Sequence, residues 1–331
     1  MALPWHSRVL RSPLVRATAA LLLVILLGML FNADGSFFKW GTHRDMFRQV
    51  SVYGILACGM TLVIITGGID LSVGSILGLT AVLFSIFTIH WGWSPVLAIP
   101  AVLAAGLLCG AVSGGITAFF RIQPFIATLA MMVFARGLAK LVSGGQKIST
   151  AVQLPDGSYQ YVNDPPVFNT LGSKILNDNV AVVTVILLLC IVVSWIALSK
   201  LRWGRYLYAI GGNEEAARLS GIPVAAMKVM AYGLCGLFCA VAGICQAAQE
   251  VQGDPEAGST YELSAIAIVV IGGTSLRGGR GGIWLTLLGT LIIGYMEKIL
   301  SINAVGEESR LMLTGVIIVG AVLLQRSRSR S

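Results

Sequence analysis

The sequence of 331 residues contains few charged side chains. Only 11% of its residues are Asp, Glu, Lys or Arg, whereas 56% are hydrophobic. This balance excludes an ordinary soluble domain and a disordered chain, because both carry a much larger share of charge. Apolar runs of about twenty residues recur from end to end, the length needed to cross the hydrocarbon core of a bilayer. The composition predicts an all-α, polytopic membrane protein.

Motifs that would supply energy for transport are also missing. There is no G-x-x-x-x-G-K-[ST] phosphate-binding loop, and the glycine-rich run 277–281 has neither the lysine nor the hydroxyl of such a loop. No series of Asp, Glu and His follows the apolar runs, as a proton relay would require. We therefore expect a chain that is not an enzyme, binds no cofactor itself and is not an obvious proton-coupled carrier.

Cysteines and long polar stretches give no sign of a metal site or a soluble domain. The six cysteines all lie in apolar runs, where they behave as small hydrophobic residues. Cys235 and Cys239 share a helix face, but no histidine or carboxylate nearby completes a metal site. The longest polar stretch, 143–179, is too short to fold alone. The sequence thus predicts a single transmembrane domain over 1–331.

The apolar runs define about ten membrane spans. The expected spans are 17–31, 50–66, 71–89, 95–120, 124–141, 180–198, 225–248, 263–271, 283–300 and 311–324. With a cytoplasmic N-terminus, most loop Lys and Arg residues fall inside and most acids outside, as the positive-inside rule requires. The net charge of +8 is thus explained by orientation and not by a nucleic-acid partner. Both termini are predicted in the cytoplasm, with 143–179 outside and 200–228 inside.

Two glycine-rich stretches interrupt the apolar runs and share one pattern. Residues 67–74 read GGIDLSVG and residues 272–279 read GGTSLRGG, an internal repeat of G-G-x-x-L-x-x-G. Non-helical backbone at membrane depth must be buried in protein or line a cavity. Glycine interruptions at corresponding places in two halves of a chain point to a transport pathway. The candidate pathway or gate residues are Gly67, Gly68, Asp70, Ser72, Gly74, Gly272, Gly273, Thr274 and Ser275.

Asp70 allows two interpretations. An ionisable residue at membrane depth is rare and is usually functional. A carboxylate just before an apolar helix can also cap the free N–H groups of that helix. Ser275 occupies the matching position of the second stretch and is a capping type as well, which favours the structural interpretation.

The inside loop 200–228 carries signals for one short helix. Asn213 is a good N-cap and two acids follow it, while Gly221 and Pro223 stop the helix. A plain connector between two spans would need no capped helix and no apolar Ala217 or Leu219. We therefore predict a helix at 213–222 that docks a soluble partner. Its contact residues would be Asn213, Glu214, Glu215, Ala216, Ala217, Arg218, Leu219 and Gly221.

Four stretches resemble the permeases of ribose-type ABC sugar importers: 67–74, QPFIATL at 123–129, 204–222 and 261–279. The resemblance covers roughly 45–325. It implies a bacterial inner-membrane subunit that pairs with a second permease, receives its sugar from a periplasmic binding protein and is driven by ATPase subunits that use the ATP. It also implies that 213–222 is the coupling helix that contacts the ATPase.

The predicted function is therefore the permease subunit of an ATP-driven importer of a monosaccharide, working by alternating access. A self-sufficient facilitator or ion-coupled secondary transporter is the alternative. It would need polar sugar ligands inside the membrane, and the spans offer few hydroxyls. A receptor or scaffold is a third class, but the sequence provides no soluble output domain for it.

Overall fold

The computed structural model describes residues 12–153, 157–306, 308–313 and 315–316. Within these residues, eight helices are long and apolar enough to cross a membrane. They are α2 (Pro13–Leu30), α3 (Trp40–Ile65), α4 (Val73–Ser85) with its π-helical extension η2 (Ile86–His90), α5 (Pro95–Phe119), α6 (Pro124–Ser143), α8 (Val182–Ser199), α11 (Val224–Glu250) and α13 (Ile283–Ile302). A 3-10 turn, η1 (Ser36–Phe38), precedes α3. The prediction of an all-α, multi-pass membrane protein is confirmed.

Two of the ten predicted spans are not among these eight helices. The span expected at 263–271 is the helix α12 (Tyr261–Gly272), which has 12 residues. At 1.5 Å per residue it is about 18 Å long, too short to cross a core of about 30 Å by itself. The span expected at 311–324 lies largely outside the described residues.

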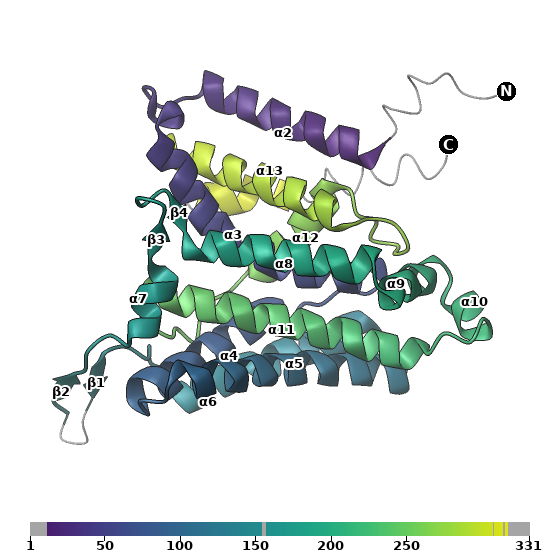
Figure 1. Cartoon of the computed structure of the whole chain (residues 1–331), viewed down its shortest axis with the longest axis horizontal. Helices are drawn as coiled ribbons and strands as arrows, with labels where there is room; N and C mark the ends of the chain where they lie inside the picture. Colours follow the sequence, from purple (N-terminus) through teal and green to yellow (C-terminus); the bar gives the residue numbers. More distant parts are fainter. Residues whose placement is uncertain (1–11, 154–156, 307, 314, 317–331) are drawn as a thin grey trace.

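The helices run side by side (Figure 1), and α3 and α4 with η2 are the most deeply buried of the eight spans. The helix α3 packs against α8, α11, α12 and α13, and α4 packs against α5, α6 and α11. The outer faces of α2, α5, α6 and α8 carry exposed large hydrophobic side chains. Such an exterior is suited to lipid or to a neighbouring membrane subunit.

Small residues bring α5 and α11 into close contact. A Cβ at Gly106 would overlap the Gly236 carbonyl oxygen, and one at Gly114 would lie 2.9 Å from the Val229 Cα. The first turns of α2, α5 and α6 each place a proline where its missing N–H costs nothing. The small residues of 95–120 thus allow the two backbones to approach closely.

Non-membrane elements gather at the two ends of the bundle (Figure 1). We call one end the α10 end, because α9 (Arg202–Gly212) and α10 (Glu214–Leu219) lie there. The other is the hairpin end, with strands β1 (Ala151–Gln153), β2 (Tyr159–Tyr161), β3 (Lys174–Ile175) and β4 (Val180–Ala181) and the helix α7 (Pro166–Gly172). The loops 143–179 and 200–228 thus lie at opposite ends, as the charge pattern requires.

The loop at the hairpin end is folded onto the bundle. Its strands form two antiparallel pairs, β1 with β2 and β3 with β4. Phe168 of α7 is buried and stacks on Phe84 of α4 at a centroid distance of 5.2 Å. An antiparallel bridge also joins Ile148 to Gly253. These contacts hold the loop 143–179 against the hairpin end of the bundle.

Candidate functional site

The first glycine stretch is a buried break between α3 and α4. The helix α3 ends at Ile65 and α4 begins at Val73. Gly67 has a φ of +83°, a left-handed conformation that favours glycine. Gly68 lies against the Tyr232 side chain of α11, and a Cβ there would overlap the phenolic oxygen. Gly74 lies in the first turn of α4, against the backbone of Gly258.

Asp70 is fully buried and holds the turn that follows the glycines. Its Oδ1 accepts hydrogen bonds from the Ser72 backbone N–H at 2.9 Å and from the Ser72 hydroxyl at 2.5 Å. Its Oδ2 is buried and has no hydrogen-bond partner. The N-cap position of α4 belongs to Ser72, which makes no side-chain capping bond. The structural role of Asp70 is therefore in the turn before the helix and not at the helix start that we expected.

The second stretch is also a break between two helices, with a similar turn. The helix α12 ends at Gly272, and α13 begins at Ile283. Gly273 has a φ of +111°, and the Ser275 Oγ accepts from the Arg277 N–H at 3.3 Å, two residues ahead as in Asp70 and Ser72. Thr274 is buried, and its Oγ1 accepts from the Gly282 N–H at 3.4 Å. The matching roles of Asp70 and Ser275 support the internal repeat.

The two stretches meet at the α10 end. The Gly279 N–H donates to the Ile65 carbonyl at 2.9 Å, so α3 and α12 both end at the same place. Gly211 of α9 lies between these groups, because its Cβ position would overlap the Ile65 oxygen and lie 2.5 Å from the Gly279 nitrogen. A Cβ at Gly278 would lie 2.8 Å from the Gly67 nitrogen. We call Ile65, Gly67, Gly211, Gly278 and Gly279 the glycine junction.

Tyr208 makes a further link between α9 and the second stretch. Its hydroxyl donates to the Gly281 carbonyl at 3.0 Å. Burial raises the pKa of the Tyr208 phenol, which keeps it a neutral donor at physiological pH. Neither this contact nor the packing of Tyr232 on Gly68 could be predicted, because a single tyrosine in a loop or an apolar run has no pattern that reveals its partner.

The helix α10 follows directly after the junction. Asn213 caps it, with Oδ1 accepting from the Ala216 N–H at 3.0 Å. Glu214 pairs with Arg218 at 3.2 Å and with Lys228 of α11 at 2.7 Å. Glu215 also pairs with Arg218, and Gly221 has a φ of +82° beyond the end of the helix. The capped helix expected at 213–222 is present as Glu214–Leu219.

The two apolar side chains of α10 point in different directions. Ala217 is buried against Ile210 and Val224 of the same chain. Leu219 is 81% exposed. Of these two apolar side chains, Leu219 is thus the one available to a partner.

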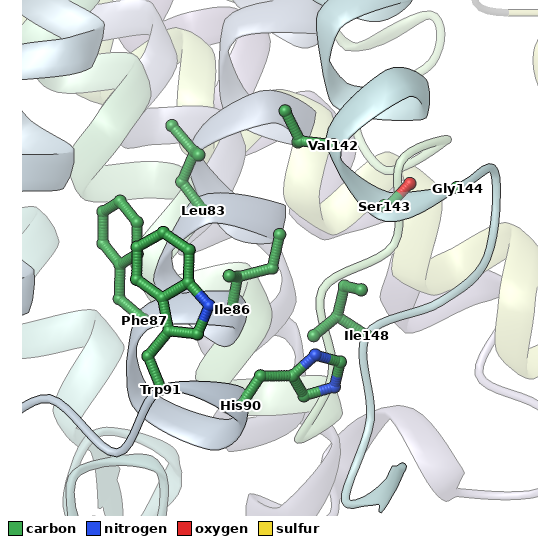
Figure 2. Close-up of a pocket in the computed structure, with 9 residues that line it drawn as sticks. All are labelled: Leu83, Ile86, Phe87, His90, Trp91, Val142, Ser143, Gly144 and Ile148. Atoms are coloured by element: carbon green, nitrogen blue, oxygen red, sulfur yellow. The ribbon is translucent and has the colours of Figure 1, made fainter. Parts of the chain in front are cut away.

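A cavity of about 470 Å³ lies at the hairpin end, between α4 with η2 and the end of α6. Figure 2 shows its lining, with the His90 ring turned toward Ile148. The polar side chains in this lining are those of His90 and Ser143. It is too apolar to bind a polyhydroxyl molecule closely.

Residues 44–322 match the family described as the permease component of branched-chain amino acid transport systems. The chain belongs to this permease family. It is 39% identical over 318 residues to the ribose import permease of Escherichia coli K12, covering 95% of each chain. It is 41% identical to the ribose import permease of Bacillus subtilis 168, with 93% of this chain and 91% of that one covered.

More distant relatives are permeases named for other sugars. The fructose import permease of Rhizobium meliloti is 34% identical, with 97% of this permease and 86% of that chain covered. The xylose transport system permease of Escherichia coli K12 is 31% identical, with 94% and 91% covered. No solved structure is a significant match.

Proposed function

We propose that this permease is the membrane-spanning subunit of an ATP-driven importer of a monosaccharide in the bacterial inner membrane. The relatives with the higher identities are named for ribose, and those named for fructose and xylose follow. All of them match over most of both chains, so the likeness includes the loops as well as the spans. A pentose or hexose is thus the proposed cargo.

The observation that supports an external energy source is the helix α10. It is capped by Asn213, tied to α11 by the Glu214–Lys228 ion pair and exposes Leu219. Only one residue, Gly212, separates its cap from Gly211 of the glycine junction. A force applied to α10 therefore reaches the ends of α3 and α12 through a few bonds. We assign the contact with an ABC ATPase subunit to Asn213, Glu214, Glu215, Ala216, Arg218, Leu219 and Gly221, with buried Ala217 anchoring the helix.

Alternating access follows from this geometry. The ATPase pair closes on ATP and moves α10, and the glycine junction carries the movement to both glycine stretches. The gate residues Gly67, Gly68, Asp70, Ser72, Gly74, Gly272, Gly273, Thr274 and Ser275 then shift against one another and against a second permease subunit. A periplasmic binding protein delivers the sugar at the hairpin end, where Tyr159 and Tyr161 are exposed.

Co-purification of an ATPase with the solubilised permease tests the proposal. Leu219→Asp should abolish recovery of the ATPase, because burying a carboxylate in the contact costs several kcal/mol. Ala217→Asp is a poor test, because it would disrupt the packing of α10 on its own chain. The matched control is Leu176→Asp, which changes a leucine that is 71% exposed at the hairpin end.

Two results would contradict the proposal in different ways. Equal recovery of the ATPase with Leu219→Asp and with the unaltered chain would remove the coupling role of α10. Failure of any ATPase to bind the unaltered permease, combined with sugar transport by the permease alone, would favour a self-sufficient carrier.

A further inference from the structure

A second cavity, of about 420 Å³, lies between α6 and the start of α12. Its lining contains more polar and charged side chains than that of the cavity at the hairpin end, together with Met132 and Val133. Met132, Arg136 and Lys140 recur every four residues and therefore share one face of α6. Ser75 of α4 and Thr260 and Glu262 of the α12 segment complete the polar lining.

This cavity extends from near the end of α6 toward the interior of the bundle. Arg136 is seven residues before the end of α6 at Ser143, or about 10 Å along the helix. The Cβ position of Gly258 is 3.1 Å from the Cα of Gly74, and Gly74 is about 24 Å along α4 from His90 at the hairpin end. The chain thus enters the bundle without regular helix between Glu250 and Tyr261.

Backbone of this kind is stable at membrane depth only inside protein or beside a water-filled cavity. Arg136 satisfies part of it, because its Nη1 donates to the carbonyl oxygens of Pro255 and Ala257. Glu262 forms no ion pair with another described residue, although it lies near Arg136. Its own backbone N–H and the nearby guanidinium of Arg136 stabilise this half-buried carboxylate, which can also accept hydrogen bonds from water or from a ligand with donors.

We infer that this cavity is where the transported sugar contacts the permease within the membrane. The inference rests on the proposed function and specifies its substrate site. The Glu262 carboxylate accepts hydrogen bonds from sugar hydroxyls, and the ammonium of Lys140 and the outer edge of Arg136 donate to sugar oxygens. Met132 provides an apolar surface for the C–H groups of the sugar ring. The volume is within the range of small-molecule sites, about 300–1,000 Å³.

The sequence analysis did not identify the residues that line this cavity, although one signal was present. Arg136 and Lys140 are charged residues in the apolar run 124–141, and such residues are functional candidates. The position of Glu262 could not be predicted, because nothing in the sequence shows that 251–260 descends into the bundle.

The first test measures uptake of labelled ribose, xylose and fructose by the complete transporter in proteoliposomes. Glu262→Gln should lower kcat/KM for the transported sugar by about tenfold, because a charged acceptor of hydrogen bonds is lost. Recovery of the ATPase should be unchanged. Asp254→Asn is the matched control, since Asp254 belongs to the same irregular segment and pairs with Lys147, and neither residue lines the cavity. It should leave uptake within about twofold.

The second test asks whether water reaches the cavity. A membrane-impermeant methanethiosulfonate bearing a sulfonate should modify Met132→Cys and block uptake, and saturating sugar should slow the modification. Phe134→Cys, on the exposed apolar side of α6, should not react. The unaltered chain provides the background, because five of its six cysteines are buried and Cys109 is half-buried.

Normal uptake by Glu262→Gln, or a Met132→Cys that does not react, would overturn the inference while leaving the proposed function intact. Uptake of none of the three sugars by the unaltered transporter would refute the sugar importer itself, and with it this inference.

Discussion

Replacing Gly211 by alanine should separate the glycine junction. The new Cβ would overlap the Ile65 carbonyl oxygen and lie 2.5 Å from the Gly279 nitrogen, so it is placed in the middle of the hydrogen bond between them. Overpacking costs about 1–3 kcal/mol, and loss of that bond costs about 0.5–1.5 kcal/mol. The better helix propensity of alanine within α9 offsets about 1 kcal/mol.

The net expectation is a destabilisation of about 2 kcal/mol, which corresponds to a fall in Tm of roughly 5 °C. Thermal unfolding of the solubilised permease measures it, and sugar uptake by the reconstituted transporter should fall with it. Gly212→Ala is the matched control. It lies in the same helix with nothing within 4 Å of its Cβ position, so it should be neutral or stabilising by up to about 1 kcal/mol. Equal Tm values and equal uptake for the two variants would refute the reasoning.

Three further predictions concern the first glycine stretch and the topology. Gly68→Ala should lower uptake because its Cβ would overlap the Tyr232 hydroxyl, and adding Tyr232→Phe should restore most of it; a double variant as inactive as the single one would contradict this cause. Asp70→Asn should cost about 1 kcal/mol or less, since the amide oxygen still accepts from Ser72, whereas Asp70→Leu should cost about 1–3 kcal/mol in thermal unfolding. Loss of uptake by Asp70→Asn at a normal Tm would show that the charge itself is required. Cysteines placed at the exposed Ser158 and Ser220 should react with an impermeant thiol reagent from opposite sides of the membrane, and reaction from one side would reverse the topology.

The spans were predictable because burial in lipid requires a minimum apolar length. Eight helices match predicted runs, and their charged flanks lie at the expected ends. The run at 263–271 has the apolar composition of a span, but α12 is too short to cross the membrane. It begins deep in the bundle, after an irregular segment. No local pattern reports the depth at which a helix begins.

The site was predictable in type but not in its contacts. The glycine motifs identified the breaks in the helices, and Asn213 with its two acids identified α10. Their meeting depends on main-chain approaches between Ile65, Gly211 and Gly279, which are far apart in sequence. Main-chain hydrogen bonds between distant loops leave no trace in side-chain composition, so only the folded structure reveals them.

The glycine junction is made mainly of main-chain atoms, and this has a consequence for how the protein can diversify. A contact between peptide groups does not depend on the identity of the neighbouring side chains, provided that the glycines remain. Surrounding positions in α3 and α9 can therefore drift without altering how movement passes between them. Related proteins can therefore change their cargo specificity elsewhere in the bundle while the glycine junction stays the same.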